Sequence, residues 1–228
     1  MENREMENSV VEKPSLIGMI MNPTVQFERI RENPKILVAI LIVTFLTVIG
    51  MLMMSSGMEL PTDDPELAGM GEEELMVIAM ISQVSFVIVG LFTPIFTIFI
   101  STVVLLIIAK IVRSEVSFKQ LFSMNTYIYM ISALGILLNG LIFMILQVGD
   151  SEVYITSLNS IVHAEGVLGA FLGIVEVFSI WSLIITGIGL QVVAKFSKGL
   201  SWSIVVAFFI VGAVFAMVSA ALGSAFGV

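Results

Sequence analysis

Residues 75–109 read LMVIAMISQVSFVIVGLFTPIFTIFISTVVLLIIA and contain no charged side chain. As one helix the run would be about 52 Å long, whereas the hydrocarbon core of a bilayer is about 30 Å thick. It is therefore either one kinked helix or a hairpin that turns at Thr93-Pro94. A hairpin would leave a short second arm and would place the following basic residues outside. We predict one crossing near residues 88–109, kinked at Pro94, with residues 75–87 continuing at or above the outer surface.

The basic residues of the chain fall into three clusters, and long uncharged stretches separate them. The polar loops around residues 59–74 and 150–165 contain acids and no basic residue. By the positive-inside rule, this segregation orients a polytopic membrane protein with its N-terminus in the cytoplasm. The clusters are Arg4, Lys13, Arg29, Arg31 and Lys35; Lys110, Arg113 and Lys119; and Lys195 and Lys198.

Composition points to the bilayer as the solvent of this chain. Apolar residues make up 58% of 228 positions, charged residues make up 12%, and the mean hydropathy is +1.08. The net charge of −8 arises mainly from the outer loops, and the sequence has no basic patch that would bind nucleic acid. The absence of cysteine excludes disulfides, thiolate metal sites and a cysteine nucleophile. No apolar segment near the start resembles a cleaved signal peptide.

These patterns predict an all-α fold, a polytopic bundle of five transmembrane helices in the cell membrane with the N-terminus inside. Residues 1–35 are expected to form a cytoplasmic tail and an interfacial amphipathic segment, and residues 36–228 the transmembrane bundle. The spans are expected at about residues 36–55, 88–109, 121–147, 174–194 and 203–226.

The segment before the first span predicts a short helix on the membrane surface. Asn22-Pro23 and Asn33-Pro34 each pair a capping residue with a proline at the first helical position. Phe27 would lie against the membrane, with Arg29 and Arg31 near the headgroups. A plain juxtamembrane linker is the alternative interpretation.

Two polar residues within the predicted spans are candidate functional residues. Glu176 is an ionisable group inside a span, which by default suggests a functional role. Its distance from Lys195 places it near the outer headgroups, however, where a wetted or internally hydrogen-bonded carboxylate explains it as well. Asn139 lies deeper, and its amide needs a partner, most simply across a helix interface.

No catalytic, cofactor or metal motif is present in the sequence. The single histidine, His163, lies near Glu165, Asp150 and Glu152, but the spacing matches no metal-ligand motif, and a solvated acidic loop explains these residues equally. Nucleotide-binding and nucleophile-elbow motifs are also absent. We therefore predict no cofactor, no metal and no enzymatic activity.

Small residues recur at helical spacing in the last two predicted spans. Gly212, Ala216, Ala220 and Ser224 lie four residues apart, and a similar face includes Gly169 and Gly173. Such residues let helix backbones approach closely in lipid. The faces are expected to pack within the bundle, or against another integral membrane protein or a second copy of the chain.

Several stretches together resemble the Yip-domain family (Ypt-interacting-protein type) of five-span membrane proteins. They are the Asn-Pro motifs of residues 22–34, the stretch SFKQLF at 117–122 with the tyrosines that follow it, and residues 178–199, which include Trp181, a further candidate functional residue. Likeness to prokaryotic members implies an accessory membrane subunit that works with an ABC-type exporter and protects cells from a secreted toxic peptide. Eukaryotic relatives imply a scaffold for small GTPases in membrane traffic. The resemblance implies no catalytic residues.

The function expected is that of a non-enzymatic membrane adaptor or assembly protein. The alternative is a small transporter or channel, and an enzyme acting at the surface is a third possibility that requires His163 and acids to converge in a cleft. A transporter needs its polar groups to converge on one water-filled cavity, whereas scattered, individually paired groups favour an adaptor. The groups concerned are Thr44, Thr47, Ser82, Gln83, Ser85, Asn139 and Glu176.

Overall fold

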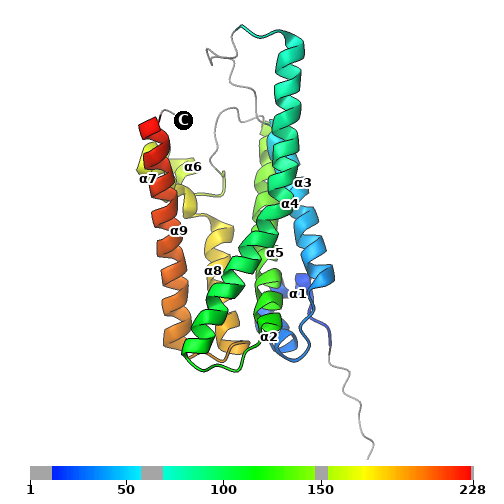
Figure 1. Cartoon of the computed structure of the whole chain (residues 1–228), viewed down its shortest axis with the longest axis vertical. Coiled ribbons are helices and arrows are strands. Elements are labelled where there is room, and N and C mark those ends of the chain that lie inside the picture. Colours follow the sequence, from blue (N-terminus) through cyan, green and yellow to red (C-terminus); the bar gives the residue numbers. More distant parts are fainter. Residues whose placement is uncertain (1–11, 58–68, 147–153, 227–228) are drawn as a thin grey trace, which may run out of the picture.

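The structure, a computed structural model, describes residues 12–57, 69–146 and 154–226 (Figure 1). Its named elements are all helices, which confirms the predicted all-helical fold. They are α1 Leu16–Met21, α2 Pro23–Glu32, α3 Leu37–Gly57, α4 Glu72–Ile111, α5 Phe118–Leu146, α6 Asn159–Val162, α7 Gly166–Ile174, α8 Val177–Val192 and α9 Lys198–Phe226.

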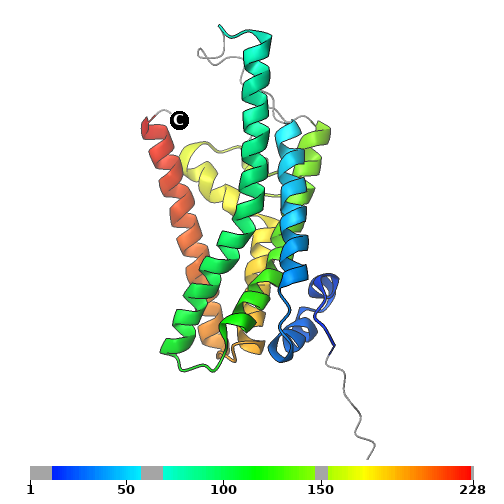
Figure 2. The ribbon, with the colours of Figure 1, turned by 45° about the vertical axis from the view of Figure 1, so that its right-hand side comes forward.

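Four of these helices, α3, α4, α5 and α9, are long and apolar enough to cross a membrane. They stand roughly side by side along the long axis of the molecule (Figures 1 and 2). The predicted span four, residues 174–194, contains only α8, which has 16 residues, because α7 ends at Ile174, where that span was expected to begin. The five-span count and the cytoplasmic N-terminus therefore stay predictions.

Residues 72–111 form one continuous helix, so the hairpin alternative is wrong. Pro94 lies inside α4, and the helix bends in its middle part (Figure 1). This bend agrees with the kink predicted there, because proline removes one backbone hydrogen bond and its ring displaces the preceding turn. Residues 75–87 belong to the same helix.

Helix α5 forms the centre of the bundle and contacts α3, α4 and α8. Small residues bring α3 and α5 together: a Cβ added at Gly140 would lie 2.2 Å from the carbonyl oxygen of Gly50. Any side chain at Gly140 would force the two backbones apart. Close backbone contact of this kind is a main source of helix association in lipid.

The short helices α1 and α2 lie below α3 and α5 at one end of the bundle (Figures 1 and 2). Ser15 caps α1 by accepting from Gly18 N at 3.2 Å, and Asn22 caps α2 by accepting from Val25 N at 3.5 Å, with Pro23 at the first helical position. Both caps follow the expected chemistry of helix starts. At the opposite end, α7 packs against α9. Helix α8 packs against α5, α9 and α2.

Candidate functional site

Glu176 interrupts the apolar segment between α7 and α8 and caps the start of α8. It is buried, with 4% of its surface exposed. Its side chain accepts hydrogen bonds from Phe178 N at 3.0 Å and Ser179 N at 2.7 Å. A carboxylate at a helix N-terminus satisfies backbone N–H groups that have no partner in the helix and interacts favourably with the helix dipole.

A third donor reaches Glu176 from the loop that precedes α6. The hydroxyl of Thr156 donates to Glu176 Oε1 at 2.6 Å. The backbone pairs beside it, because Leu158 N donates to Val175 O at 2.9 Å and Val177 N donates to Thr156 O at 3.3 Å. The loop therefore holds the break between α7 and α8 through both side chain and backbone.

The same loop satisfies the amide of Asn139 on α5. Asn139 Nδ2 donates to Thr156 Oγ1 and to its own helix at Gly135 O, both at 2.8 Å, and Thr156 N donates to Asn139 Oδ1 at 3.3 Å. The predicted need for a partner is met, but the partner comes from a loop and not from a neighbouring helix. Asn139, Thr156 and Glu176 thus form one continuous polar network, referred to here as the outer network, in which Asn139 and Glu176 are buried and Thr156 is half-buried.

Tyr154 and the turn before α7 lie next to the outer network in the chain. Burial raises the pKa of Tyr154, and the negative charge of Glu176 raises that pKa further. Asn159 closes the turn by accepting from Ala164 N at 2.9 Å and donating to Ala164 O at 3.1 Å.

His163 and Glu165 are exposed in that turn, and His163 adopts a left-handed backbone conformation. Asp150 and Glu152 lie outside the described residues. Within the described ranges, no group of three or more His, Cys, Asp or Glu side chains could hold a metal ion.

At the other end of the bundle, the structure corrects the prediction for Phe27. The side chain is fully buried instead of lying on the membrane surface. A Cβ added at Gly189 of α8 would lie 2.9 Å from the tip of the Phe27 ring and 3.0 Å from the sulfur of Met124. The glycine leaves room for the ring, so burial against α5 and α8 replaces contact with lipid, and α2 closes this end of the bundle.

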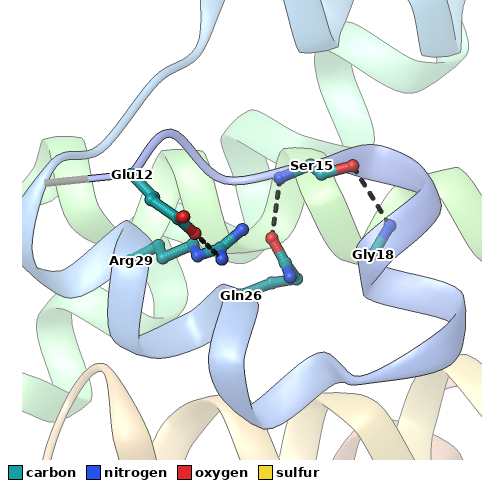
Figure 3. A network of polar contacts seen from close by, with 5 residues as sticks. All are labelled: Glu12, Ser15, Gly18, Gln26 and Arg29. Carbon is teal, nitrogen blue, oxygen red and sulfur yellow. Dashed lines mark hydrogen bonds and ion pairs between the residues drawn. The ribbon is translucent and has the colours of Figure 1, made fainter. Parts of the chain in front are cut away.

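The two arginines of α2 contact protein rather than standing free among headgroups. Arg29 forms an ion pair with Glu12 (Figure 3). Arg31 donates to Val192 O at 3.4 Å, at the C-terminal end of α8. A cation is favourable at this position because the last carbonyls of a helix carry partial negative charge.

The outer part of α4 differs from its inner part in burial. The buried residues of α4 begin at Gly90 and recur every three or four residues to Ala109, along the face toward the bundle. Between Glu72 and Val89, called the outer arm here, α4 has no buried residue, although Met76, Met80 and similar side chains are apolar. Figure 1 shows this arm rising beyond the other helices.

Comparison with known proteins identifies the family. The Yip1 domain matches residues 17–220, from α1 into α9. This chain belongs to the Yip1 family. It is also 32% identical to the membrane protein YknW of Bacillus subtilis (strain 168), over 236 aligned positions that cover 100% of both chains. No solved structure matches the chain.

Membership of the Yip1 family confirms the resemblance seen in the sequence and assigns the chain to no known enzyme family. Together with the four long apolar helices, it gives the chain a multi-pass membrane location.

Only some residues of the two small-residue faces are packed against other parts of the Yip1 domain. On α9, Ala216 and Ala220 are half-buried, whereas Gly212 and Ser224 are exposed. On α7, a Cβ at Gly169 would lie 2.2 Å from Ala164 O, so this glycine is needed by the turn before the helix. Gly173 and Gly212 have no atom within 4 Å of an added Cβ.

The polar groups suggested for a transport pathway do not converge in the Yip1 domain. Thr47 donates to Val43 O at 2.8 Å and Ser85 to Ile81 O at 2.9 Å, each within its own helix, while Ser82 and Gln83 are exposed on the outer arm. Asn139 and Glu176 belong to the outer network. Two cavities, of about 670 and 900 Å³, are lined by none of these residues.

Trp181 and Thr156 illustrate what sequence reasoning found and missed in the Yip1 domain. Trp181 is half-buried and packs beside Phe178 with ring centroids 6.3 Å apart, so it lies with the core rather than in a cavity. Thr156 connects Asn139 and Glu176 yet was not singled out. The only signal for it was its place in a loop before a span that carries a carboxylate.

Proposed function

We propose that this Yip1 protein is a non-enzymatic adaptor or assembly factor that docks onto another integral membrane complex through the outer arm of α4. The partner proposed is an ABC-type exporter, as the likeness to prokaryotic members implies. The location proposed is the cell membrane, with five passages, of which the α7–α8 pair is one, and the N-terminus in the cytoplasm.

The length of the outer arm carries the proposal. A Cβ at Gly90 would lie 3.0 Å from Val48 Cα, so α4 meets α3 near the middle of α3. From Gly90 back to Glu72 the helix rises roughly 27 Å, whereas α3 continues only about 14 Å from Val48 to Gly57. The end of the arm therefore extends roughly 13 Å past α3.

That end is apolar after its first turn. Glu72, Glu73 and Glu74 occupy the first turn, where acids are favourable, and Met76, Val77 and Met80 follow with more than half of their surface exposed. A bilayer of about 30 Å that matches α3 ends near the level of Met80 and does not cover Met76 and Val77. Apolar surface that lipid leaves uncovered typically marks a protein contact, and methionine adapts well to such contacts.

A transporter receives no comparable support. Its candidate polar groups are bonded within single helices, exposed on the outer arm or joined in the outer network, which the described cavities do not reach. By the criterion of convergence stated above, this arrangement favours the adaptor.

Photo-crosslinking in native membranes tests the proposal. A photoreactive amino acid replaces Met76 on the outer arm or, as the control, Phe215 on the exposed face of α9. We expect the Met76 position to form adducts with a second membrane protein, identified by mass spectrometry as an exporter subunit, and the Phe215 position to label lipid alone.

Two results would contradict the proposal. One is equal labelling of lipid from both positions with no protein adduct. The other is a chain that purifies alone from native membranes and moves solute in reconstituted vesicles, which would establish the transporter.

A further inference from the structure

A groove at the end of the bundle closed by α1 and α2 combines basic and apolar residues. It lies between α1, the start of α3 and α5, and has a volume of about 900 Å³. Lys13, Lys35 and Lys119 line it, and no acidic residue does. Its apolar lining includes Leu37, Val38 and Ile42 of α3 and Met130 of α5.

The chain around Lys13 is fixed by contacts on both sides. Glu12 pairs with Arg29, and Ser15 N donates to Gln26 Oε1 at 2.7 Å (Figure 3). The hydroxyl of Tyr127 on α5 donates to Pro14 O at 3.2 Å. Glu12 is thereby engaged by an arginine, and Lys13 is held at the edge of the groove.

The other two lysines lie where two long helices begin. Lys35 precedes α3 by two residues, and Lys119 is the second residue of α5. Among the described residues, no carboxylate lies within ion-pair distance of Lys13, Lys35 or Lys119. Basic residues at the ends of membrane helices lie at the level of the lipid phosphates.

Next to this charge, the wall of the groove is strongly apolar and exposed. Leu37 and Val38 have 72% and 69% of their surface exposed. A free phosphate would neutralise the lysines but leave this wall uncovered. A neutral lipid would cover the wall but leave three ammonium groups that have no carboxylate partner among the described residues. We propose that the groove binds one anionic phospholipid, with its phosphate against the lysines and an acyl chain along α3.

Native mass spectrometry of the full chain in detergent tests this proposal with phosphatidylglycerol and phosphatidylcholine as probes. We expect phosphatidylglycerol to be retained in preference to phosphatidylcholine. In the double variant Lys35→Gln/Lys119→Gln, binding of phosphatidylglycerol should weaken by about 10- to 30-fold, since each lysine near a lipid surface contributes on the order of 1 kcal/mol.

A matched control removes two positive charges at positions outside the groove. Lys110 and Lys198 are exposed and line neither cavity, so Lys110→Gln/Lys198→Gln should leave retention unchanged. A second variant, Ile42→Trp, keeps all three lysines and fills the apolar part of the groove, and it too should reduce retention. Elution volume and helical circular dichroism verify that each variant is folded.

Three results would overturn the proposal. Retention of phosphatidylcholine equal to that of phosphatidylglycerol would show that the lysines do not select an anionic lipid. Equal loss in the control pair would indicate attraction by overall charge. Displacement of the lipid by millimolar inorganic phosphate, together with no effect of Ile42→Trp, would show a simple anion site. Photo-crosslinking from the outer arm tests the adaptor separately, so either proposal can fail alone.

Discussion

The carboxylate of Glu176 receives three hydrogen bonds, from two backbone N–H groups of α8 and from the hydroxyl of Thr156. A buried carboxylate is costly unless it is hydrogen-bonded, and bonds to a charged acceptor are among the stronger ones. Here the bonds also hold the start of α8 beside α5 through Asn139. The arrangement assigns Glu176 a structural role in the break between two helices.

Replacing Glu176 with alanine should destabilise the detergent-solubilised protein by about 2 kcal/mol, because it removes a helix cap and leaves the Thr156 hydroxyl without its acceptor. The midpoint of thermal unfolding measures the effect. Glu165→Ala is the matched control, since Glu165 occupies the same capping position of α7 but makes no side-chain capping bond. Equal midpoints for the two variants would show that the outer network does not stabilise the fold.

Sequence reasoning identified Glu176 and Asn139 but not the connection between them. An ionisable or amide side chain in an apolar run is conspicuous, and the interpretation of Glu176 as internally hydrogen-bonded is confirmed. Thr156 is a common residue in a polar loop, 17 positions after Asn139 and 20 before Glu176. Only the return of that loop into the bundle brings the three together, and local sequence does not encode it.

Among the elements, α2 and α8 show how an amphipathic segment can be buried rather than lie on lipid. The apolar face of α2 that suggested a membrane-surface helix inserts Phe27 and Ile30 into the core. A hydrophobic stripe indicates that a helix face avoids water, but it does not indicate whether protein or lipid covers that face. The deciding feature is on another element, where Gly189 leaves space for the Phe27 ring.

Gly189→Ala should therefore loosen the contact between α2 and α8. The added methyl group lies too close to the rigid Phe27 ring, and overpacking of this kind costs about 1–3 kcal/mol. Limited proteolysis of the segment containing α1 and α2, together with thermal unfolding, reports the change.

Gly173→Ala provides the comparison, because no atom lies within 4 Å of an added Cβ there. It should be neutral or stabilise α7 by up to about 1 kcal/mol through helix propensity. If Gly189→Ala proved as harmless as Gly173→Ala, α2 would not be packed against α8 as described.

For the whole molecule, α3, α4, α5 and α9 extend along one axis, and the first and last of these long helices run in the same direction (Figure 2). The uncharged run of residues 75–109 predicted one kinked helix correctly. It could not show where packing of α4 against the bundle begins, because exposed and packed apolar residues look alike in a sequence. Burial at every third or fourth position from Gly90 onward makes the distinction.

Accessibility of single cysteines tests the proposed orientation without background, because the chain contains no cysteine. In intact cells, a membrane-impermeant maleimide should label Glu73→Cys in the first turn of α4 but not Glu115→Cys in the turn after α4, although both residues are exposed. Opening the cells should make Glu115→Cys reactive. Labelling of Glu115→Cys from outside would refute the cytoplasmic placement of that turn.

The interrupted α7–α8 segment also has a consequence for biosynthesis. A helix of 16 residues that begins with a buried carboxylate is a poor candidate for independent insertion into a bilayer. Thr156, which donates to the carboxylate, and Asn139, which is bonded to Thr156, both precede Glu176 in the chain, so the ribosome delivers them first. The side chains of Asn139 and Thr156 are therefore already synthesised when Glu176 joins the outer network.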